Sequence, residues 1–176
     1  MPVVTYSLIV TNVLIFILVK AKVFDYVDLG NCYTMVHDYG QKARLFTCAF
    51  THSHFFHIFF NMISLHNLGS ILEPVLGSVT FVLIYISAIF VSSIFSEKYH
   101  FRKGNPQTIS IGASGAICAL LGMTCVLLFK SGGISSFTSI LRSIIPLVLM
   151  GFSPVIDSAG HFSGLALGIL LGIFIL

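Results

Sequence analysis

Two short motifs in this sequence contain residue types that can perform nucleophilic chemistry. Ser114 lies among small residues in the segment Gly112-Ala113-Ser114-Gly115, and His161 directly follows Gly160. A serine hydroxyl becomes an effective nucleophile when a base within hydrogen-bond reach removes its proton, and a neutral imidazole is the usual base. We therefore interpret Ser114 as a candidate catalytic nucleophile and His161 as its candidate base.

A third polar group, earlier in the chain, contains hydrogen-bond donors. His57 and Asn61 are four residues apart, so a helix would place them on one face about one turn apart. With the backbone N–H groups near Ser114, they could stabilise the oxyanion that forms when a peptide carbonyl is attacked. The alternative is structural, because His and Asn side chains also join membrane helices by hydrogen bonds.

The histidines of this group raise the question of a metal site. His52, His54 and His57 could form one, but the sequence offers no carboxylate or cysteine partner at a suitable spacing. The four cysteines also lack a metal-binding spacing, and we interpret them as reduced thiols. We therefore predict no metal ion in the site.

The composition indicates which elements must position these residues. The chain is 56% hydrophobic and 9% charged, whereas soluble domains carry about 25% charged residues. Within a bilayer, backbone groups must be satisfied internally, which leaves helices or a closed barrel, and the long unbroken apolar runs favour helices. The net charge of +3 is scattered without a basic stripe, which argues against nucleic-acid binding. We therefore predict an all-α, multi-pass integral membrane protein.

Six apolar runs approach the ~20 residues that cross a hydrocarbon core of ~30 Å. We predict a single domain, 1–176, with transmembrane helices at residues 3–19, 46–72, 79–95, 109–129, 136–152 and 159–176. Arg142 and Pro146 interrupt the fifth run, and a membrane helix tolerates such a proline as a kink. The first run lacks the features of a removed signal peptide, so we expect it to be retained.

Small residues predict how the fourth and sixth helices meet. Glycines recur every four residues in the sixth run, at positions 160, 164, 168 and 172, a spacing that lets membrane helices approach closely. In the fourth run, Gly115 lies beside Ser114 on a similar narrow face of small residues, although such faces also serve helix packing without any catalytic role. Two crossings separate Ser114 from His161, which places both on one side of the bilayer. Asp157 could orient His161 or be an ordinary loop carboxylate.

Taken together, these motifs resemble the rhomboid family of intramembrane serine proteases. The matching segments are residues 57–61, 112–115 and 160–161 with Gly164 and Gly168, together with the spaced Gly69, Glu73 and Gly77. The resemblance implies a six-helix bundle with a Ser114–His161 dyad, no cofactor, and cleavage of transmembrane protein substrates. It also implies that the fifth helix and the loop before His161 form the substrate gate and cap. It does not fix an oligomeric state.

Some positions depart from the family pattern. Cys118 stands where many relatives have a tyrosine, and Ala43-Arg44 replaces a Trp-Arg pair. Seven of the nine basic residues lie in the first and third loops, on the same side of the membrane as the motifs. The positive-inside rule places that side in the cytoplasm, whereas the family orientation is the opposite. We follow the family and expect the cell (plasma or inner) membrane.

Two other functions are consistent with parts of the sequence. One is a catalytically inactive rhomboid-like protein that binds membrane-protein clients, although inactive members usually lose the serine or the histidine. The other is a small transporter that uses the histidines between His52 and His66, but the chain shows no inverted repeat. We therefore favour the protease.

Overall fold

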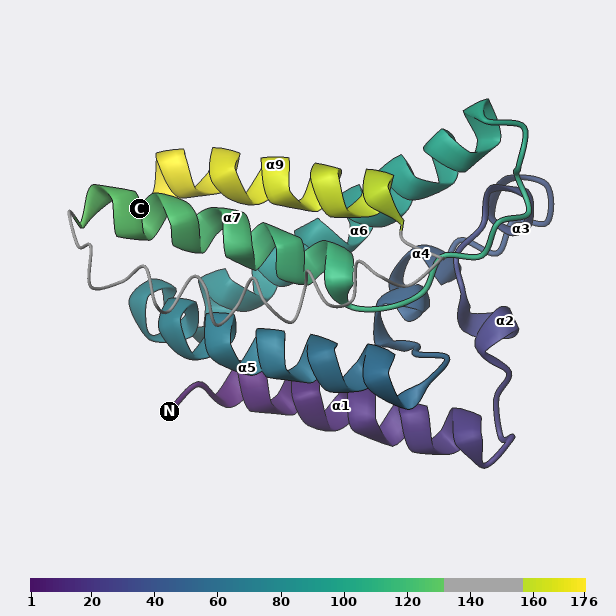
Figure 1. Cartoon of the computed structure of the whole chain (residues 1–176), viewed down its shortest axis with the longest axis horizontal. Helices are drawn as coiled ribbons and strands as arrows, with labels where there is room; N and C mark the ends of the chain where they lie inside the picture. The colour runs from purple at the N-terminus through teal and green to yellow at the C-terminus, as the bar shows by residue number, and fades with distance from the viewer. Residues whose placement is uncertain (132–156) are drawn as a thin grey trace.

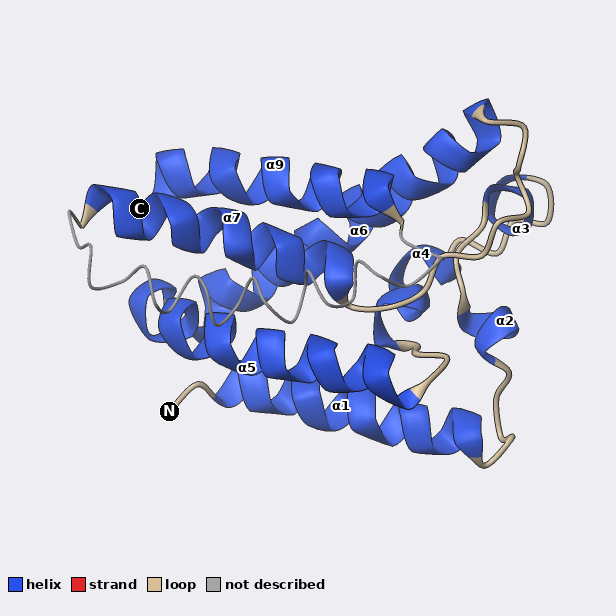
Figure 2. Cartoon of the chain, viewed as in Figure 1, coloured by secondary structure: helices blue, strands red, loops and turns tan. Residues whose placement is uncertain are grey.

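The computed structural model describes residues 1–131 and 157–176, and its framework is a set of long helices. These are α1 (Val3–Lys20), α5 (Phe55–Leu76), α6 (Ser78–Arg102), α7 (Ser114–Lys130) and α9 (Ser158–Ile175). Within the described ranges there is no strand, only an isolated bridge between Asn31 and Ser110 (Figure 2). In Figure 1, α1 runs beside α5 and α7 runs beside α9, with α5, α7 and α9 all starting at the same end of the molecule.

The connection between α1 and α5 contains short helical segments at that same end. They are α2 (Tyr26–Leu29), α3 (Tyr33–His37), α4 (Arg44–Thr47) and the 3₁₀ turn η1 (Cys48–Phe50). The buried Arg44 side chain holds this connection together, because its Nη1 donates to the carbonyl oxygens of Val27 (2.5 Å) and Gly30 (2.8 Å). The connection therefore forms an ordered layer over one end of the helices.

Four of the described helices are long and apolar enough to cross a membrane: α1, α5, α6 and α9. The apolar α7 is shorter, at 17 residues. The prediction of an all-helical, multi-pass membrane protein is thereby confirmed for the described residues. The predicted fifth helix, 136–152, with Arg142 and Pro146, lies outside them, so the count of six transmembrane helices stays a prediction.

Four helix ends differ by four or more residues from those predicted from hydropathy. One is the end of the second long helix, which continues past 72 to Leu76 with Pro74 inside it. The second long helix starts at Phe55 rather than at 46, because His54 caps it by accepting a hydrogen bond from the His57 N–H (3.2 Å). The third continues to Arg102 rather than 95, since charged residues such as Lys98 favour helix once they reach water. The fourth starts at Ser114 rather than 109, because Gly112 has a φ of +112° that no α-helix accommodates.

Glu73 joins α5 to the start of α1. Its carboxylate accepts hydrogen bonds from the backbone N–H groups of Val4 (2.9 Å) and Thr5 (2.8 Å), and from the hydroxyls of Thr5 (2.7 Å) and Ser78 (2.7 Å). The first-turn N–H groups of a helix lack partners within their own helix, and here another helix supplies one. Glu73 is therefore a cap for α1 supplied from α5.

The core lies between α5, α6 and α7. Its largest fully buried apolar side chains are Leu65, Leu68, Leu72, Phe81, Tyr85, Ile89, Ile117, Leu120 and Met123. By contrast, large apolar residues of α1 and α9 such as Leu14 and Phe174 are exposed. A soluble surface rarely carries such extended apolar faces, whereas lipid solvates them.

The helices α7 and α9 approach each other backbone to backbone. A Cβ at Gly164 would collide with the carbonyl oxygen of Gly115, and one at Gly168 would collide with that of Ala119. From the other side, a Cβ at Gly122 would lie 2.5 Å from the Leu165 carbonyl oxygen. Glycine at these positions removes the side chains that would hold the two helices apart. This glycine seam brings the N-terminal turns of α7 and α9 together.

Candidate active site

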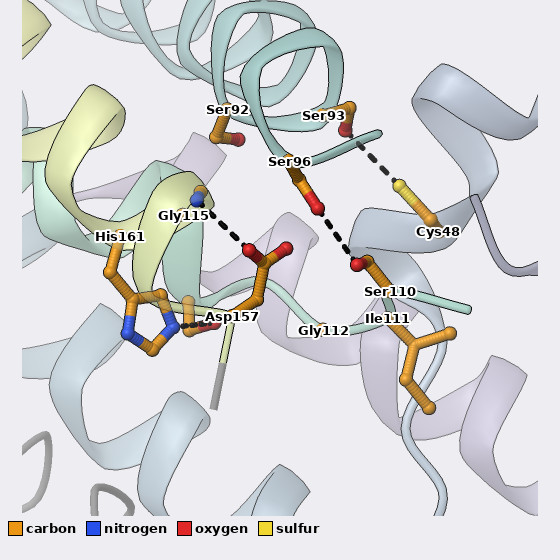
Figure 3. Close-up of a pocket in the computed structure, with 12 residues that line it drawn as sticks. Cys48, Ser92, Ser93, Ser96, Ser110, Ile111, Gly112, Gly115, Asp157 and His161 are labelled. Carbon is orange, nitrogen blue, oxygen red and sulfur yellow. Dashed lines mark hydrogen bonds between the residues drawn. The ribbon is translucent and has the colours of Figure 1, made fainter. Parts of the chain in front are cut away.

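Ser114 and His161 are hydrogen-bonded to each other across the glycine seam. The distance from His161 Nε2 to Ser114 Oγ is 2.7 Å (Figure 3), within the range of a strong hydrogen bond. Ser114 is the first residue of α7 and is 7% exposed, while His161 lies in the first turn of α9. The geometry is that of a nucleophile paired with a base.

Gly112 shapes the turn that leads into Ser114. Its positive φ favours glycine, and a Cβ there would lie 2.5 Å from Nε2 of His57. The Gly112 N–H donates to the carbonyl oxygen of Cys48 (2.9 Å), which fixes the turn to η1. The imidazole of His57 therefore lies against the turn that carries Ser114.

Asn61 is one turn further into α5 and makes a different contact. Its Nδ2 donates to the carbonyl oxygen of His57 (2.9 Å), and its Oδ1 has no hydrogen-bond partner among the described residues. The side chain is fully buried. The structure thus brings His57 to the turn before Ser114, whereas Asn61 is linked to this region through the His57 backbone.

A polar cavity of about 30 Å³ adjoins the Ser114–His161 pair, enough for one or two water molecules. Besides the pair, its polar lining consists of Cys48, Ser92, Ser93, Ser96, Ser110 and Asp157. The hydroxyls of Ser96 and Ser110 are 2.8 Å apart, and Cys48 Sγ lies 3.2 Å from the Ser93 hydroxyl. The four serines were not singled out from the sequence, although three serines within five residues, at 92, 93 and 96, at the end of an uncharged apolar run are the signal that could have revealed them.

Cys48 is the other potential nucleophile in this cavity. Burial raises the pKa of its thiol to about 11, the hydrogen bond to Ser93 lowers it, and the Asp157 carboxylate raises it further. A thiol with such a pKa stays protonated near neutral pH and reacts slowly, because the thiolate is the reactive form. Ser114 is therefore the better candidate nucleophile.

His52 and His54, which precede α5, and His57, in its first turn, are the histidines that a metal site here would use. Among the described residues, no group of three or more His, Cys, Asp or Glu side chains could hold a metal ion. His52 is fully buried and packs edge-on to His57, with ring centroids 4.8 Å apart. Burial lowers the pKa of His52 well below the ordinary value, so the ring is neutral at physiological pH. A neutral imidazole is also the form that binds a metal, so the absence of a metal ion at His52, His54 and His57 stays a prediction.

The remaining predicted positions are the glycines around the pair. Gly115 and Gly164 face each other in the glycine seam, and Gly168 packs one turn further on. A Cβ at Gly115 would also meet the side chain of Ser92, 2.5 Å from its Oγ. A Cβ at Gly160 would lie 3.0 Å from a carboxylate oxygen of Asp157. Glycine at these positions avoids the contacts that a Cβ would make with the neighbouring backbone and side chains.

The fold and this site define a helical, multi-pass membrane protein with a partly buried serine–histidine pair. A family model, the Rhomboid domain, matches residues 39–176, which include α4 to α9 and both residues of the pair. This chain therefore belongs to the rhomboid family. The match to the family model begins after α1, α2 and α3.

Several curated relatives resemble the chain. RHOMBOID-like protein 1 of Arabidopsis thaliana is 35% identical over 134 residues, covering 73% of this chain and 33% of the relative. Rhomboid-type serine protease B of Aspergillus fumigatus is 33% identical over 144 residues, covering 76% and 52%. Rhomboid protein 1, mitochondrial, of Saccharomyces cerevisiae is 28% identical over 114 residues, covering 59% and 33%. The chain thus spans about a third to a half of the length of these relatives.

Proposed function

We propose that this protein is an intramembrane serine endopeptidase that cleaves transmembrane segments of other membrane proteins. The observation that carries the proposal is the 2.7 Å hydrogen bond between Ser114 and His161, beside a polar cavity in an otherwise apolar bundle. The family includes proteins named as serine proteases, such as the relative from Aspergillus fumigatus. A lipid-solvated bundle admits its substrate from the membrane, so transmembrane segments are the natural substrate class.

In this mechanism Ser114 attacks the scissile carbonyl while His161 accepts the hydroxyl proton and then delivers it to the leaving amine. Because α7 begins at Ser114, the N–H groups of its first turn are free of helical partners and lie at the positive end of the helix. They are suitable donors for the oxyanion, and His57 lies next to them. Asn61 also donates to the oxyanion, through the amide N–H that does not bond the carbonyl oxygen of His57. These steps need no cofactor.

For the location, we propose the cell membrane, plasma or inner. Two relatives, from Saccharomyces cerevisiae and Arabidopsis thaliana, carry mitochondrial names. Fractionation of cells that express a tagged chain separates these locations, and recovery in mitochondria would contradict the proposal. The family orientation, with the active-site loops outside the cytoplasm, is tested in the same cells by the accessibility of an engineered cysteine at Lys103.

The test of the activity uses purified protein in detergent with a model transmembrane substrate. We expect Ser114→Ala and His161→Ala each to reduce cleavage to background, because removing one member of such a pair costs about 10⁴-fold or more. Matched controls are Ser131→Ala at the far end of α7 and His66→Ala on the exposed face of α5, which should cleave normally. A fluorophosphonate probe should label the wild type at Ser114.

The catalytically inactive alternative makes the opposite prediction. A folded wild-type protein that binds membrane-protein clients but neither cleaves them nor reacts with the probe would establish it. Undiminished cleavage by Ser114→Ala or by His161→Ala would contradict the proposed mechanism.

A further inference from the structure

We propose that Asp157 is a positioning residue for His161, and that its carboxylate stabilises the imidazolium that forms when His161 takes the Ser114 proton. This inference rests on the proposed function, and it adds a third participant, a charged carboxylate, to the serine–histidine pair. It is carried by four observations: the contacts of Asp157 with the first turn of α9, the space that Gly160 leaves for it, its place in the cavity, and the shortage of other charges there.

The first observation is that Asp157 holds the backbone that carries His161. Its Oδ1 accepts a hydrogen bond from the Gly160 N–H (3.0 Å), and its carbonyl oxygen accepts one from the His161 N–H (3.0 Å). The Gly160 N–H lacks a partner within the helix and is capped by the carboxylate, whereas the His161 N–H makes the ordinary first hydrogen bond of the helix, to the carbonyl of its N-cap residue. The carboxylate therefore anchors the turn of α9 that carries His161.

The second observation concerns Gly160. A Cβ at this position would lie 3.0 Å from Oδ2 of Asp157 and 3.2 Å from its Cγ. A larger residue would therefore require the carboxylate to shift by a few tenths of an ångström. Glycine before the histidine thus leaves room for the carboxylate beneath the first turn of α9.

The third observation is the position of the charge. The Asp157 carboxylate points into the cavity that also contains Ser114 and His161, and Figure 3 shows it between His161 and Ser96. Its influence extends across this space, since it contributes to raising the pKa of Cys48 on the opposite wall. Charges interact more strongly in a protein interior than in water, because the effective dielectric constant is lower.

Few other charged groups compete with His161 for this carboxylate. The cavity lining among the described residues includes no Lys, Arg or Glu. His100, at the end of α6, has its Nε2 3.9 Å from Asp157 Oδ1, which is too long for a hydrogen bond. The remaining neighbours are the neutral Cys48 thiol on η1 and serine hydroxyls. Among the described residues, an imidazolium at His161 would therefore share this carboxylate only with His100, which lies within ion-pair distance of it when protonated.

The arrangement differs from a serine–histidine–aspartate triad. No hydrogen bond joins the Asp157 carboxylate to the His161 ring in the described structure; instead, the carboxylate bonds the Gly160 N–H. Asp157 thus acts on His161 through the backbone and through space. Loss of its charge should slow the reaction without the near-complete loss expected for Ser114 or His161.

The experiment separates the charge of Asp157 from its role as a helix cap. Asp157→Asn and Asp157→Ser both retain a good capping side chain but lack the charge, whereas Asp157→Ala lacks both. We expect the Asn and Ser variants to melt at the wild-type temperature, to keep KM, and to lose about tenfold in kcat, equivalent to about 1.4 kcal/mol. Labelling of Ser114 by a fluorophosphonate should slow by a similar factor. Asp157→Ala should also melt at a lower temperature.

The matched control is Asp38→Asn, which removes an exposed carboxylate from the loop after α3 and should change neither kcat nor labelling. If Asp157→Asn and Asp157→Ser retain the wild-type kcat and labelling rate, Asp157 is only a cap and the inference is overturned. Failure of the proposed function looks different, because the wild type itself would then show no cleavage and no labelling, which overturns both.

Discussion

The direct contact of α9 with α7 at Gly164 allows a quantitative prediction about activity. A Cβ at Gly164 would collide with the carbonyl oxygen of Gly115, which is the residue after Ser114. A backbone carbonyl in a helix cannot rotate away, so Gly164→Ala must push the two helices apart. We therefore expect this single methyl group to disturb the Ser114–His161 pair as well as the packing.

The size of the effect follows from the distances. Non-bonded carbon and oxygen atoms need roughly 3.5 Å, so the helices must separate by roughly 1 Å at this point. Gly164 is less than one turn from His161, whose bond to Ser114 is 2.7 Å long. If the two helices separate by the same amount at His161, its hydrogen bond to Ser114 becomes longer than ~3.2 Å, the upper end of a good hydrogen bond. A misplacement of about 1 Å can cost ~10²-fold in rate, and overpacking typically costs ~1–3 kcal/mol of stability.

The assay compares Gly164→Ala with Gly172→Ala on the same helix. A Cβ at Gly172 meets the side chain of Val126, at 2.9 Å from its Cβ, rather than a backbone carbonyl, and it lies about three turns from His161. We expect fluorophosphonate labelling and substrate cleavage to fall about 100-fold in Gly164→Ala, and less than threefold in Gly172→Ala. Equal rates in the two variants would refute the reasoning that links the glycine seam to the pair.

Two further predictions concern stability. Glu73→Gln should lower the free energy of unfolding by ~2–4 kcal/mol, because the amide can accept only part of the four hydrogen bonds that reach the carboxylate. An unchanged melting temperature would contradict this, and Ser114 labelling of the folded variant should be normal. His52 makes stability depend on pH: burial lowers its pKa well below 6.5, so below that pH the unfolded chain binds a proton that the folded chain does not. The free energy of unfolding should therefore be independent of His52 above about pH 6.5 and decrease by up to ~1.4 kcal/mol per pH unit below it. In His52→Phe, the dependence of thermal unfolding on pH should be flatter in this range. An equally steep dependence in the variant would exclude His52 as the cause.

The proximity of Ser114 and His161 could be predicted because it depends on patterns that a sequence records directly. The number of crossings between the two residues follows from hydropathy, and glycines at every fourth position predict a close helix contact. The structure contains that contact at Gly164 and Gly168, with the two side chains at its end. Membership of the rhomboid family was likewise predicted from the motifs and is confirmed.

Other features could not be predicted because they depend on contacts between distant segments. Apolarity alone does not show that α5 starts at Phe55, since residues 46–50 are equally apolar but fold into short segments that pack under the loops. Glu73 caps α1 through the N–H groups of Val4 and Thr5, which precede it by 69 and 68 positions in the sequence. The serine cavity likewise becomes visible only when α6, α7 and α9 are assembled, because single serines are common in membrane helices.

The short serine side chain explains why the site requires the glycine seam. Its hydroxyl is only one atom beyond Cβ, so it reaches an imidazole on a neighbouring helix only where the two backbones nearly touch. Such contact leaves no room for a polar lining within α7 and α9 themselves. The polar groups of the cavity therefore come mainly from η1, α6 and the turns that precede α7 and α9, including Ser96, Ser110 and Asp157. Substitutions in the seam should thus affect the geometry of the pair, whereas substitutions of the serines in the cavity wall should affect hydration with the geometry retained.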